Sequence, residues 1–175
     1  MRSGYQQRVE AAFAALPVGA RERRPSIGIV LGSGLGAFAE KARGVSVDYA
    51  AIPGLPKPTV AGHGGVLTVG RDVAVMAGRV HYYEGHEPDD VVLPVFLLHR
   101  LGVRTLLVTN AAGGINRSYT PGDLVLIRDH LNLQGVNPLR GPDHGPGPRF
   151  PDMSAAYSPR LRAVAREAAG GSIPE

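Results

Sequence analysis

The sequence contains no cysteine and no tryptophan. Without cysteine, a disulfide framework and a thiolate metal site are both excluded, and a reducing compartment is the natural setting. No apolar run approaches the roughly 20 residues that a membrane-spanning helix needs. The first apolar stretch, Val9 to Leu16, is interrupted by Glu10 and followed by Pro17, so it does not resemble a signal peptide. We therefore expect a cytoplasmic protein with no membrane partner.

The net charge is also small. The 175 residues carry a formal net charge of +4, and the arginines are scattered except for the short group at 21–24. Such a distribution argues against a nucleic-acid partner and suits a small anionic ligand. The 24 glycines and 15 prolines are spread along the chain and indicate turns. Length and composition predict an N-terminal helix and linker at 1–24, followed by one globular domain at 25–175.

Hydrophobic periodicity predicts an α/β fold, in which short apolar strands alternate with amphipathic helices. The run T-L-L-V-T at 105–109 is continuously apolar in its centre, which is typical of a strand buried on both faces. The expected helices are 5–16, 37–42, 90–101 and 155–169, and the expected strands are 26–31, 45–49, 66–69, 73–77, 105–109 and 124–127.

Three of these strands end in loops of small or charged residues, after Leu31, Ala77 and Thr109. If the three strands are parallel neighbours, their carboxyl ends meet in one crevice, where α/β proteins bind ligands. Glycine and alanine allow backbone N–H groups to approach an anion closely. Ser33 adds a hydroxyl there, and the loop at 78–86 adds the cation of Arg79 with two histidines and a glutamate. The pattern predicts an oxyanion site, with phosphate as the expected ligand.

A dinucleotide-binding module is the rival interpretation of the glycine loop. Gly32-x-Gly34-x-x-Ala37 satisfies the fingerprint for such a module, and Asp48 stands where an acidic residue would bond a ribose hydroxyl. The segment 27–48 is short for the usual βαβ unit of about 30 residues, however. The rival also leaves the charged loop at 78–86 unexplained.

Several of these residues also have purely structural interpretations. His63 lies between two glycines and is a candidate turn residue, and Tyr82 and Tyr83 are candidate core aromatics. Phe150 is a candidate plug within its own subunit. No histidine pair has the i, i+4 spacing with an adjacent carboxylate that marks a zinc helix, so we expect no metal site.

Ordered motifs between about residues 27 and 157 resemble the trimeric, low-molecular-mass purine nucleoside phosphorylase family. The motifs are G-S-G-L-G at 32–36, G-H at 62–63, G-R-V-H-Y-Y-E-G at 78–85, T-N-A-A-G-G at 109–114, P-G-D-L-V-L-I-R-D-H-L-N at 121–132, N-P-L-R-G-P at 137–142 and R-F-P-D-M-S at 149–154.

The resemblance implies a twisted mixed β-sheet flanked by helices and assembled as a homotrimer. It implies reversible phosphorolysis of purine ribo- or deoxyribonucleosides, in purine salvage, to the free base and the pentose 1-phosphate. Inorganic phosphate is then a co-substrate, and no metal or organic cofactor is implied.

The same resemblance implies roles for individual residues. The implied phosphate ligands are Ser33, His63, Arg79, His81 and the backbone N–H of Ala111. Glu84 is similar to the family glutamate that supports the histidine, so His81 and Glu84 are the implied catalytic pair. Tyr83 resembles the family residue that lies against the sugar. Phe150 resembles the aromatic residue that reaches over the ribose of a neighbouring subunit.

The sequence departs from the family pattern at its C-terminus. The family continues with a segment that binds the purine, and residues 172–175 resemble a connection interrupted midway. We therefore expect the N-terminal portion of a single nucleoside phosphorylase domain, truncated at its C-terminus, with little or no phosphorolytic activity of its own. The alternative is a non-catalytic phosphate- or nucleotide-binding remnant.

Overall fold

The computed structural model describes residues 4–32, 34–57, 64–143, 145–171 and 173–174. The chain forms two compact units. The first comprises Met1–Ala111 and Pro138–His144, and the second comprises Ala112–Asn137 and Gly145–Glu175. The predicted boundary between residues 24 and 25 stays a prediction.

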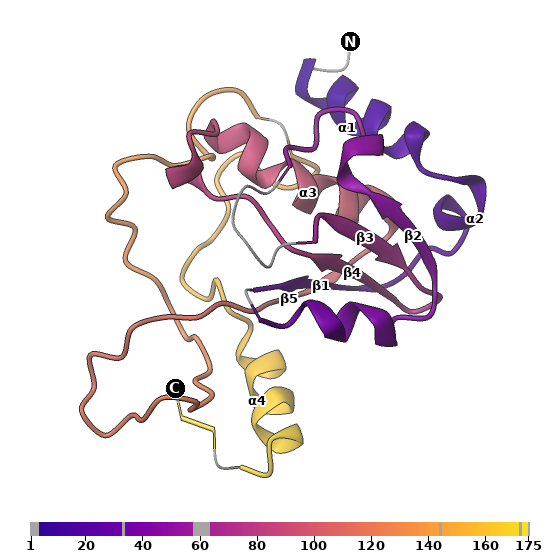
Figure 1. The fold of residues 1–175 in the computed structure, drawn as a ribbon. Helices are drawn as coiled ribbons and strands as arrows, with labels where there is room; N and C mark the ends of the chain where they lie inside the picture. Colours follow the sequence, from indigo (N-terminus) through magenta and orange to yellow (C-terminus); the bar gives the residue numbers. More distant parts are fainter. Residues whose placement is uncertain (1–3, 33, 58–63, 144, 172, 175) are drawn as a thin grey trace. The chain divides into compact units, whose positions relative to one another are not determined.

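The first unit is built on a five-stranded sheet with the order β2-β3-β4-β1-β5 (Figure 1). β1 pairs in parallel with β4 on one side and with β5 on the other, whereas β3 is antiparallel to both of its neighbours, β2 and β4. The sheet is therefore mixed, as expected. The strands are β1 (Ile27–Leu31), β2 (Val45–Asp48), β3 (Val66–Val69), β4 (Val73–Ala77) and β5 (Thr105–Val108).

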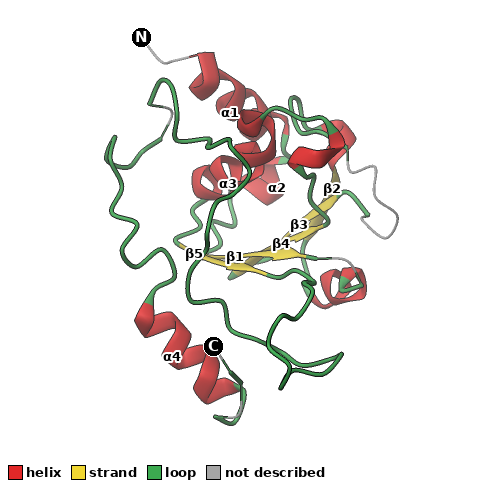
Figure 2. Cartoon of the chain, turned by 90° about the vertical axis from the view of Figure 1, so that its left-hand side faces the viewer, coloured by secondary structure: helices red, strands yellow, loops and turns green. Residues whose placement is uncertain are grey.

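Two helices, α1 (Gly4–Ala15) and α3 (Pro88–Leu101), cover one face of this sheet, and the 3-10 helix η1 (Gly36–Lys41) lies on the opposite face (Figure 2). The buried residues of α3 recur at helical spacing, at Leu93, Leu97, Leu98 and Leu101. They join the inward side chains of α1 and of the strands in a single apolar cluster. Burial of this shared stripe determines which helix face meets the sheet. The shorter helices are α2 (Val18–Arg21), η2 (Tyr49–Ala51) and η3 (Tyr82–Glu84).

Polar contacts fix α1 along α3. Arg100 bonds Glu10 through two nitrogens, at 2.9 and 3.1 Å. Its guanidinium carbon also lies 3.9 Å from the centroid of the Phe13 ring. The Tyr5 hydroxyl donates to the carbonyl of Asp89 at 2.9 Å. The predicted N-terminal helix is thus a structural part of the first unit.

Two expectations about strands were wrong. Residues 124–127 form no strand, and Leu124 is 73% exposed. The described part of the chain offers this segment one backbone hydrogen bond, from the Leu126 N–H to the Pro174 carbonyl, and a strand needs a paired ladder. β5 does form, but it occupies the sheet edge, so Leu107 and Val108 remain about half exposed instead of buried on both faces.

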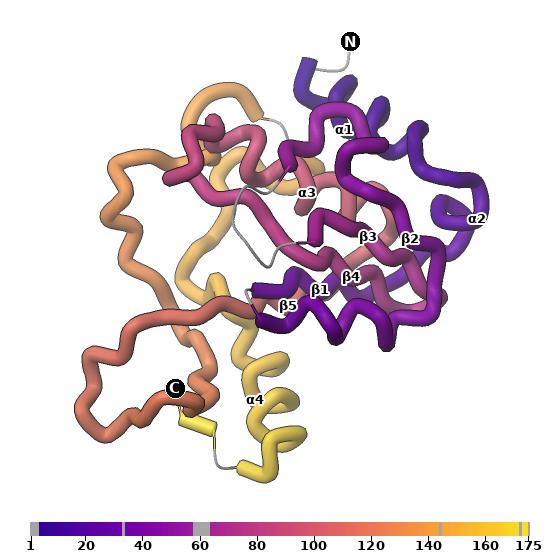
Figure 3. The backbone as a smooth tube through the Cα atoms, viewed as in Figure 1, coloured from indigo at the N-terminus to yellow at the C-terminus, as the bar shows by residue number. Residues whose placement is uncertain are grey.

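The second unit has little regular structure. Its one described helix is α4 (Pro159–Ala168), which begins after Ser158, whose hydroxyl accepts from the Leu161 N–H. The backbone at 112–137 runs without helix or strand (Figure 3). Within this unit the Tyr157 hydroxyl and His130 Nδ1 lie 2.8 Å apart. No helix in the described part of the chain is long and apolar enough to cross a membrane.

Candidate functional site

The carboxyl ends of β4, β1 and β5 lie side by side, because these three strands are parallel neighbours. Leu31 pairs in register with Ala77, and Val30 pairs with Val108. The loops that begin at Gly32, Gly78 and Thr109 therefore leave the sheet next to one another, at the carboxyl ends of these strands. This confirms the predicted convergence of the three loops, and it is the arrangement in which open α/β sheets bind ligands.

Hydrogen bonds connect these three loops directly. The Gly32 N–H donates to Thr109 Oγ1 at 2.8 Å, which links the end of β1 to the end of β5. Arg79 Nη1 donates to the Thr109 carbonyl at 2.5 Å, which links the β4 loop to the same residue. A guanidinium oriented at a cluster of strand ends is suited to gripping an oxyanion through parallel N–H groups.

The position of Gly32 allows only glycine without rearrangement. A Cβ added there would lie 2.8 Å from the Thr109 carbonyl oxygen, closer than real Cβ contacts allow. Gly78, which starts the Arg79 loop, has a φ of 105°, a value that side chains other than glycine disfavour. The Tyr49 hydroxyl, from η2, donates to the Gly78 carbonyl at 2.8 Å and so supports the loop from the core side.

His81 and Glu84 form a pair within the turn η3. Glu84 Oε1 accepts from the His81 backbone N–H at 2.7 Å and lies 2.8 Å from His81 Nδ1. The Glu84 side chain is 3% exposed, against 20% for His81. A buried carboxylate on Nδ1 keeps a proton on that nitrogen and directs Nε2 away from the pair. Glu84 is therefore placed to orient the His81 ring.

The two tyrosines of η3 are not core residues. Tyr82 is 40% exposed and Tyr83 is 74% exposed, which rules out the interpretation that they are buried aromatics. The Tyr83 ring stacks on the His81 ring, with centroids 4.7 Å apart and planes 13° from parallel. Tyr83 therefore presents a flat, accessible surface next to the histidine.

The remaining predicted site residues differ in whether the structure describes them and in how exposed they are. Ser33 and His63 lie outside the described residues. Ala111 is exposed two residues beyond Thr109, and its carbonyl accepts from Asn110 Nδ2 at 3.2 Å. Phe150 belongs to the second unit and is 86% exposed, so it does not plug that unit. In the described part of the chain, no group of three or more histidine, aspartate and glutamate side chains is placed to hold a metal ion.

Sequence reasoning overlooked Thr109 and Tyr49. Thr109 stands first in the motif T-N-A-A-G-G, where the glycines and alanines drew attention as anion-binding backbone. Its hydroxyl was a detectable signal, because at the end of an apolar strand it can both donate and accept a hydrogen bond. Tyr49 had no such signal, since its contact with Gly78 spans 29 positions of sequence.

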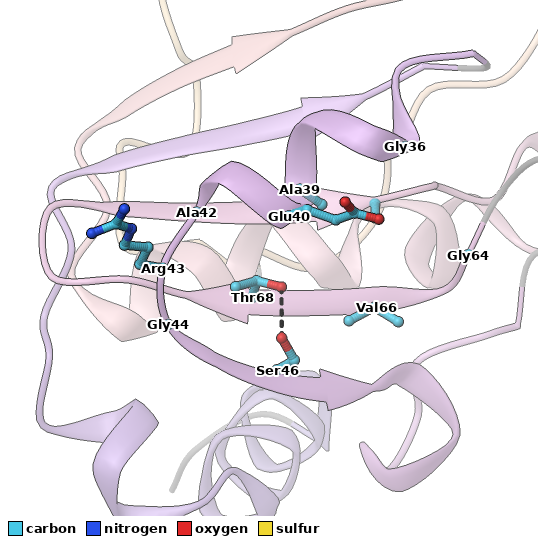
Figure 4. A pocket seen from close by; sticks show the side chains of 11 residues that line it. Gly36, Ala39, Glu40, Ala42, Arg43, Gly44, Ser46, Gly64, Val66 and Thr68 are labelled. Carbon is cyan, nitrogen blue, oxygen red and sulfur yellow. Dashed lines mark hydrogen bonds between the residues drawn. The ribbon is translucent and has the colours of Figure 1, made fainter.

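A hollow of about 720 Å³ lies on the other face of the sheet, under η1. It is open to solvent, and Ser46 Oγ and Thr68 Oγ1 meet at 3.0 Å on its floor (Figure 4). Arg79, His81 and Glu84 do not line it. Ala77, the last residue of β4, does line it. Glu40 and Arg43 are the charged residues that line the hollow. We place the chemistry at the strand ends instead, because the Arg79 guanidinium and the His81–Glu84 pair lie there.

The structure also removes the dinucleotide alternative. β2 is not adjacent to β1 in the sheet, and β2 runs antiparallel to its neighbour β3. Among the described strands, no βαβ unit therefore follows the glycine loop, and η1 is only a 3-10 helix of six residues. Asp48 Oδ1 accepts from the Ala50 N–H at 2.7 Å and so starts η2. Its role in the structure is that of a helix cap.

Comparison with known proteins gives a consistent family assignment. Residues 26–173 match the family model described as "Phosphorylase superfamily". Purine nucleoside phosphorylase 1 of Geobacillus stearothermophilus is 52% identical over 151 residues, which are 83% of this chain and 55% of that protein. Purine nucleoside phosphorylase of Mus musculus is 47% identical over 153 residues, covering 82% of this chain and 53% of that protein.

A solved structure agrees with these relatives. Isoform 2 of purine nucleoside phosphorylase from Schistosoma mansoni, in complex with cytosine and ribose-1-phosphate, superimposes with a TM-score of 0.84 at 41% identity. The match covers 94% of this chain and 61% of that one. The chain spans little more than half the length of the curated relatives named above. On this sequence and structural evidence, the chain belongs to the phosphorylase superfamily.

Proposed function

We propose that this chain carries the phosphate-binding part of a purine nucleoside phosphorylase, a pentosyltransferase of purine salvage. Its reaction is the reversible phosphorolysis of purine ribo- and deoxyribonucleosides to the free base and the pentose 1-phosphate. The observation that carries the proposal is the Arg79 guanidinium, which is bonded to Thr109 where three parallel strands end. The names of the relatives support the choice of substrate class.

In the proposed site, Arg79 and His81 hold the phosphate together with Ser33, His63 and the Ala111 N–H. Glu84 keeps the His81 ring in one tautomer, so that Nε2 faces the anion. Phosphate oxygen attacks the anomeric carbon as the C–N bond breaks, and the bonding electron pair leaves with the purine. Donors that are fixed in advance need little reorganisation as charge develops, which is the main source of such catalysis. No metal or organic cofactor takes part.

The sugar would lie against Tyr83, whose exposed ring is already stacked on His81. Phe150 would reach the ribose of a neighbouring subunit in a homotrimer. Its exposed ring supports a contact outside its own unit. A cytoplasmic location agrees with the absence of cysteine.

The test combines phosphate-dependent thermal stabilisation with inosine phosphorolysis. Phosphate at 100 times its Kd should stabilise the folded state by about 2.7 kcal/mol. Arg79→Ala should abolish both the stabilisation and any turnover. Arg71→Ala is the matched control, because Arg71 lies in the turn before β4, at the opposite end of the same strand.

Stabilisation with turnover would support the full proposal. Stabilisation without turnover would support a phosphate-binding chain that needs a complementary segment for catalysis. If the unsubstituted chain shows neither stabilisation by phosphate nor turnover, the proposal is contradicted. An equal loss in Arg71→Ala would also contradict it, because the effect would then be one of net charge.

A further inference from the structure

We propose that Thr109 is a positioning residue, which fixes the guanidinium of Arg79 for anion binding through its own backbone carbonyl. The inference rests on the proposed function and deepens it. Thr109 is partly buried at the point where β5 leaves the sheet, and it is hydrogen-bonded both to Gly32, which follows β1, and to Arg79 in the loop after β4.

Three hydrogen bonds hold Thr109 onto β1. Its backbone N–H donates to the Val30 carbonyl at 3.0 Å. Its hydroxyl donates to the same carbonyl at 3.2 Å and accepts from the Gly32 N–H at 2.8 Å. The paired register of β1 and β5 ends at Val30 and Val108, so the threonine side chain extends the link by one residue beyond the ladder.

The Thr109 carbonyl is consequently held in a fixed place, and it accepts from Arg79 Nη1 at 2.5 Å. A guanidinium has five N–H donors in a rigid plane, so one well-placed acceptor orients the whole fork. The chemical nature of the acceptor matters as well. A neutral carbonyl orients the guanidinium through a hydrogen bond and brings no negative charge of its own to compete with a phosphate dianion.

Gly32 provides independent support for a tight junction. A Cβ placed on Gly32 would have the Thr109 carbonyl oxygen itself as its nearest neighbour. The backbone after β1 and the carbonyl that holds Arg79 therefore lie close together at this junction, where the hydroxyl of Thr109 links them.

The experiment compares Thr109→Val with Thr109→Ser. Valine keeps the shape and loses the hydroxyl, whereas serine keeps the hydroxyl. The first measurement needs no ligand: the guanidinium ¹⁵N–¹H resonances of Arg79, assigned by their loss in Arg79→Ala. We expect hindered rotation and slow exchange in the unsubstituted chain and in Thr109→Ser, and averaged, fast-exchanging signals in Thr109→Val.

The second measurement is the affinity for inorganic phosphate. We expect it to fall about tenfold in Thr109→Val, or about 1.4 kcal/mol, because a carbonyl that is no longer fixed by the hydroxyl loses its hydrogen bond from Arg79, and to recover in Thr109→Ser. Thr105→Val, at the other end of β5, controls for the loss of a threonine hydroxyl from this strand. Circular dichroism of each variant verifies that it is folded.

An Arg79 signal that is unchanged in Thr109→Val would overturn the inference, and so would a Thr109→Ser variant as defective as Thr109→Val. If the unsubstituted chain does not bind phosphate at all, the proposed function fails. The positioning role is then still decided by the Arg79 resonances alone.

Discussion

The buried hydroxyl of Tyr49 donates a hydrogen bond to the carbonyl of Gly78, the residue immediately before Arg79. Tyr49 is 2% exposed and follows β2, whereas Gly78 follows β4, two strands away in the sheet. This hydrogen bond therefore connects a buried core residue to the first residue of the charged loop.

Tyr49→Phe should lower the free energy of unfolding by about 1–3 kcal/mol, because it leaves the buried Gly78 carbonyl without its donor. Urea denaturation followed by circular dichroism measures the change. Tyr82→Phe is the control, since Tyr82 is 40% exposed and a solvated hydroxyl contributes little. Equal stabilities of the two variants would show that the Tyr49 bond contributes nothing to the fold.

Stability should fall as the pH rises above about 10. Burial raises the pKa of Tyr49 above its ordinary value of 10.0. Burial, with Asp89 nearby, also raises the pKa of Tyr5. Above pH 10 the unfolded chain releases these phenol protons and the folded chain retains them. Each group then reduces stability by up to about 1.4 kcal/mol per pH unit.

The contribution of Tyr49 to this slope is separable by substitution. Between pH 10 and 11, Tyr49→Phe should show a shallower loss of stability than the unsubstituted chain, because one proton-retaining group has been removed. Thermal unfolding at closely spaced pH values measures the slope. A slope unaffected by Tyr49→Phe would mean that this phenol ionises normally in the folded state.

Gly32→Ala should destabilise the chain by about 1–3 kcal/mol, the usual cost of overpacking, because the new methyl group meets the Thr109 carbonyl oxygen at 2.8 Å. It should also weaken phosphate binding, since Arg79 bonds that same carbonyl. Gly147→Ala is the matched control, because nothing lies within 4 Å of a Cβ there. A Gly32→Ala variant as stable as the control would contradict the tight junction of β1 with β5.

Glu84→Ala should change the tautomer of His81. Glu84 Oε1 lies 2.8 Å from His81 Nδ1, and an ionised carboxylate at that position requires a proton on Nδ1. Ring ¹⁵N chemical shifts should therefore report the Nδ1–H form in the unsubstituted chain and a return toward Nε2–H in Glu84→Ala. Glu87→Ala, a nearby glutamate that precedes α3, is the control. Identical ring shifts in all three proteins would rule out orientation of the histidine by Glu84.

Local patterns in the sequence were sufficient for much of the fold. The apolar runs at 26–31 and 73–77 predicted two strands, and the sequence at 90–101 predicted the helix α3. Motif chemistry also predicted a site at the ends of parallel strands, because the carboxyl ends of such strands share one edge. These inferences depend on interactions between residues that are close in sequence, or on rules general to α/β sheets.

What the sequence left undetermined depends on contacts between distant residues. The apolar run at 105–108 predicts a central strand. Among the described strands β5 pairs with β1 alone and therefore lies at the sheet edge, which depends on strand pairing between distant residues. The missing strand at 124–127 has the same cause, since a ladder requires a partner. Thr109 holds Arg79 across 30 positions and Gly32 across 77, and Tyr49 reaches Gly78 across 29. The sequence by itself determined which residues carry charge and where strands end, because those properties are local. Only the tertiary structure decided which neutral residues fix that charge in place, because packing alone brings them together.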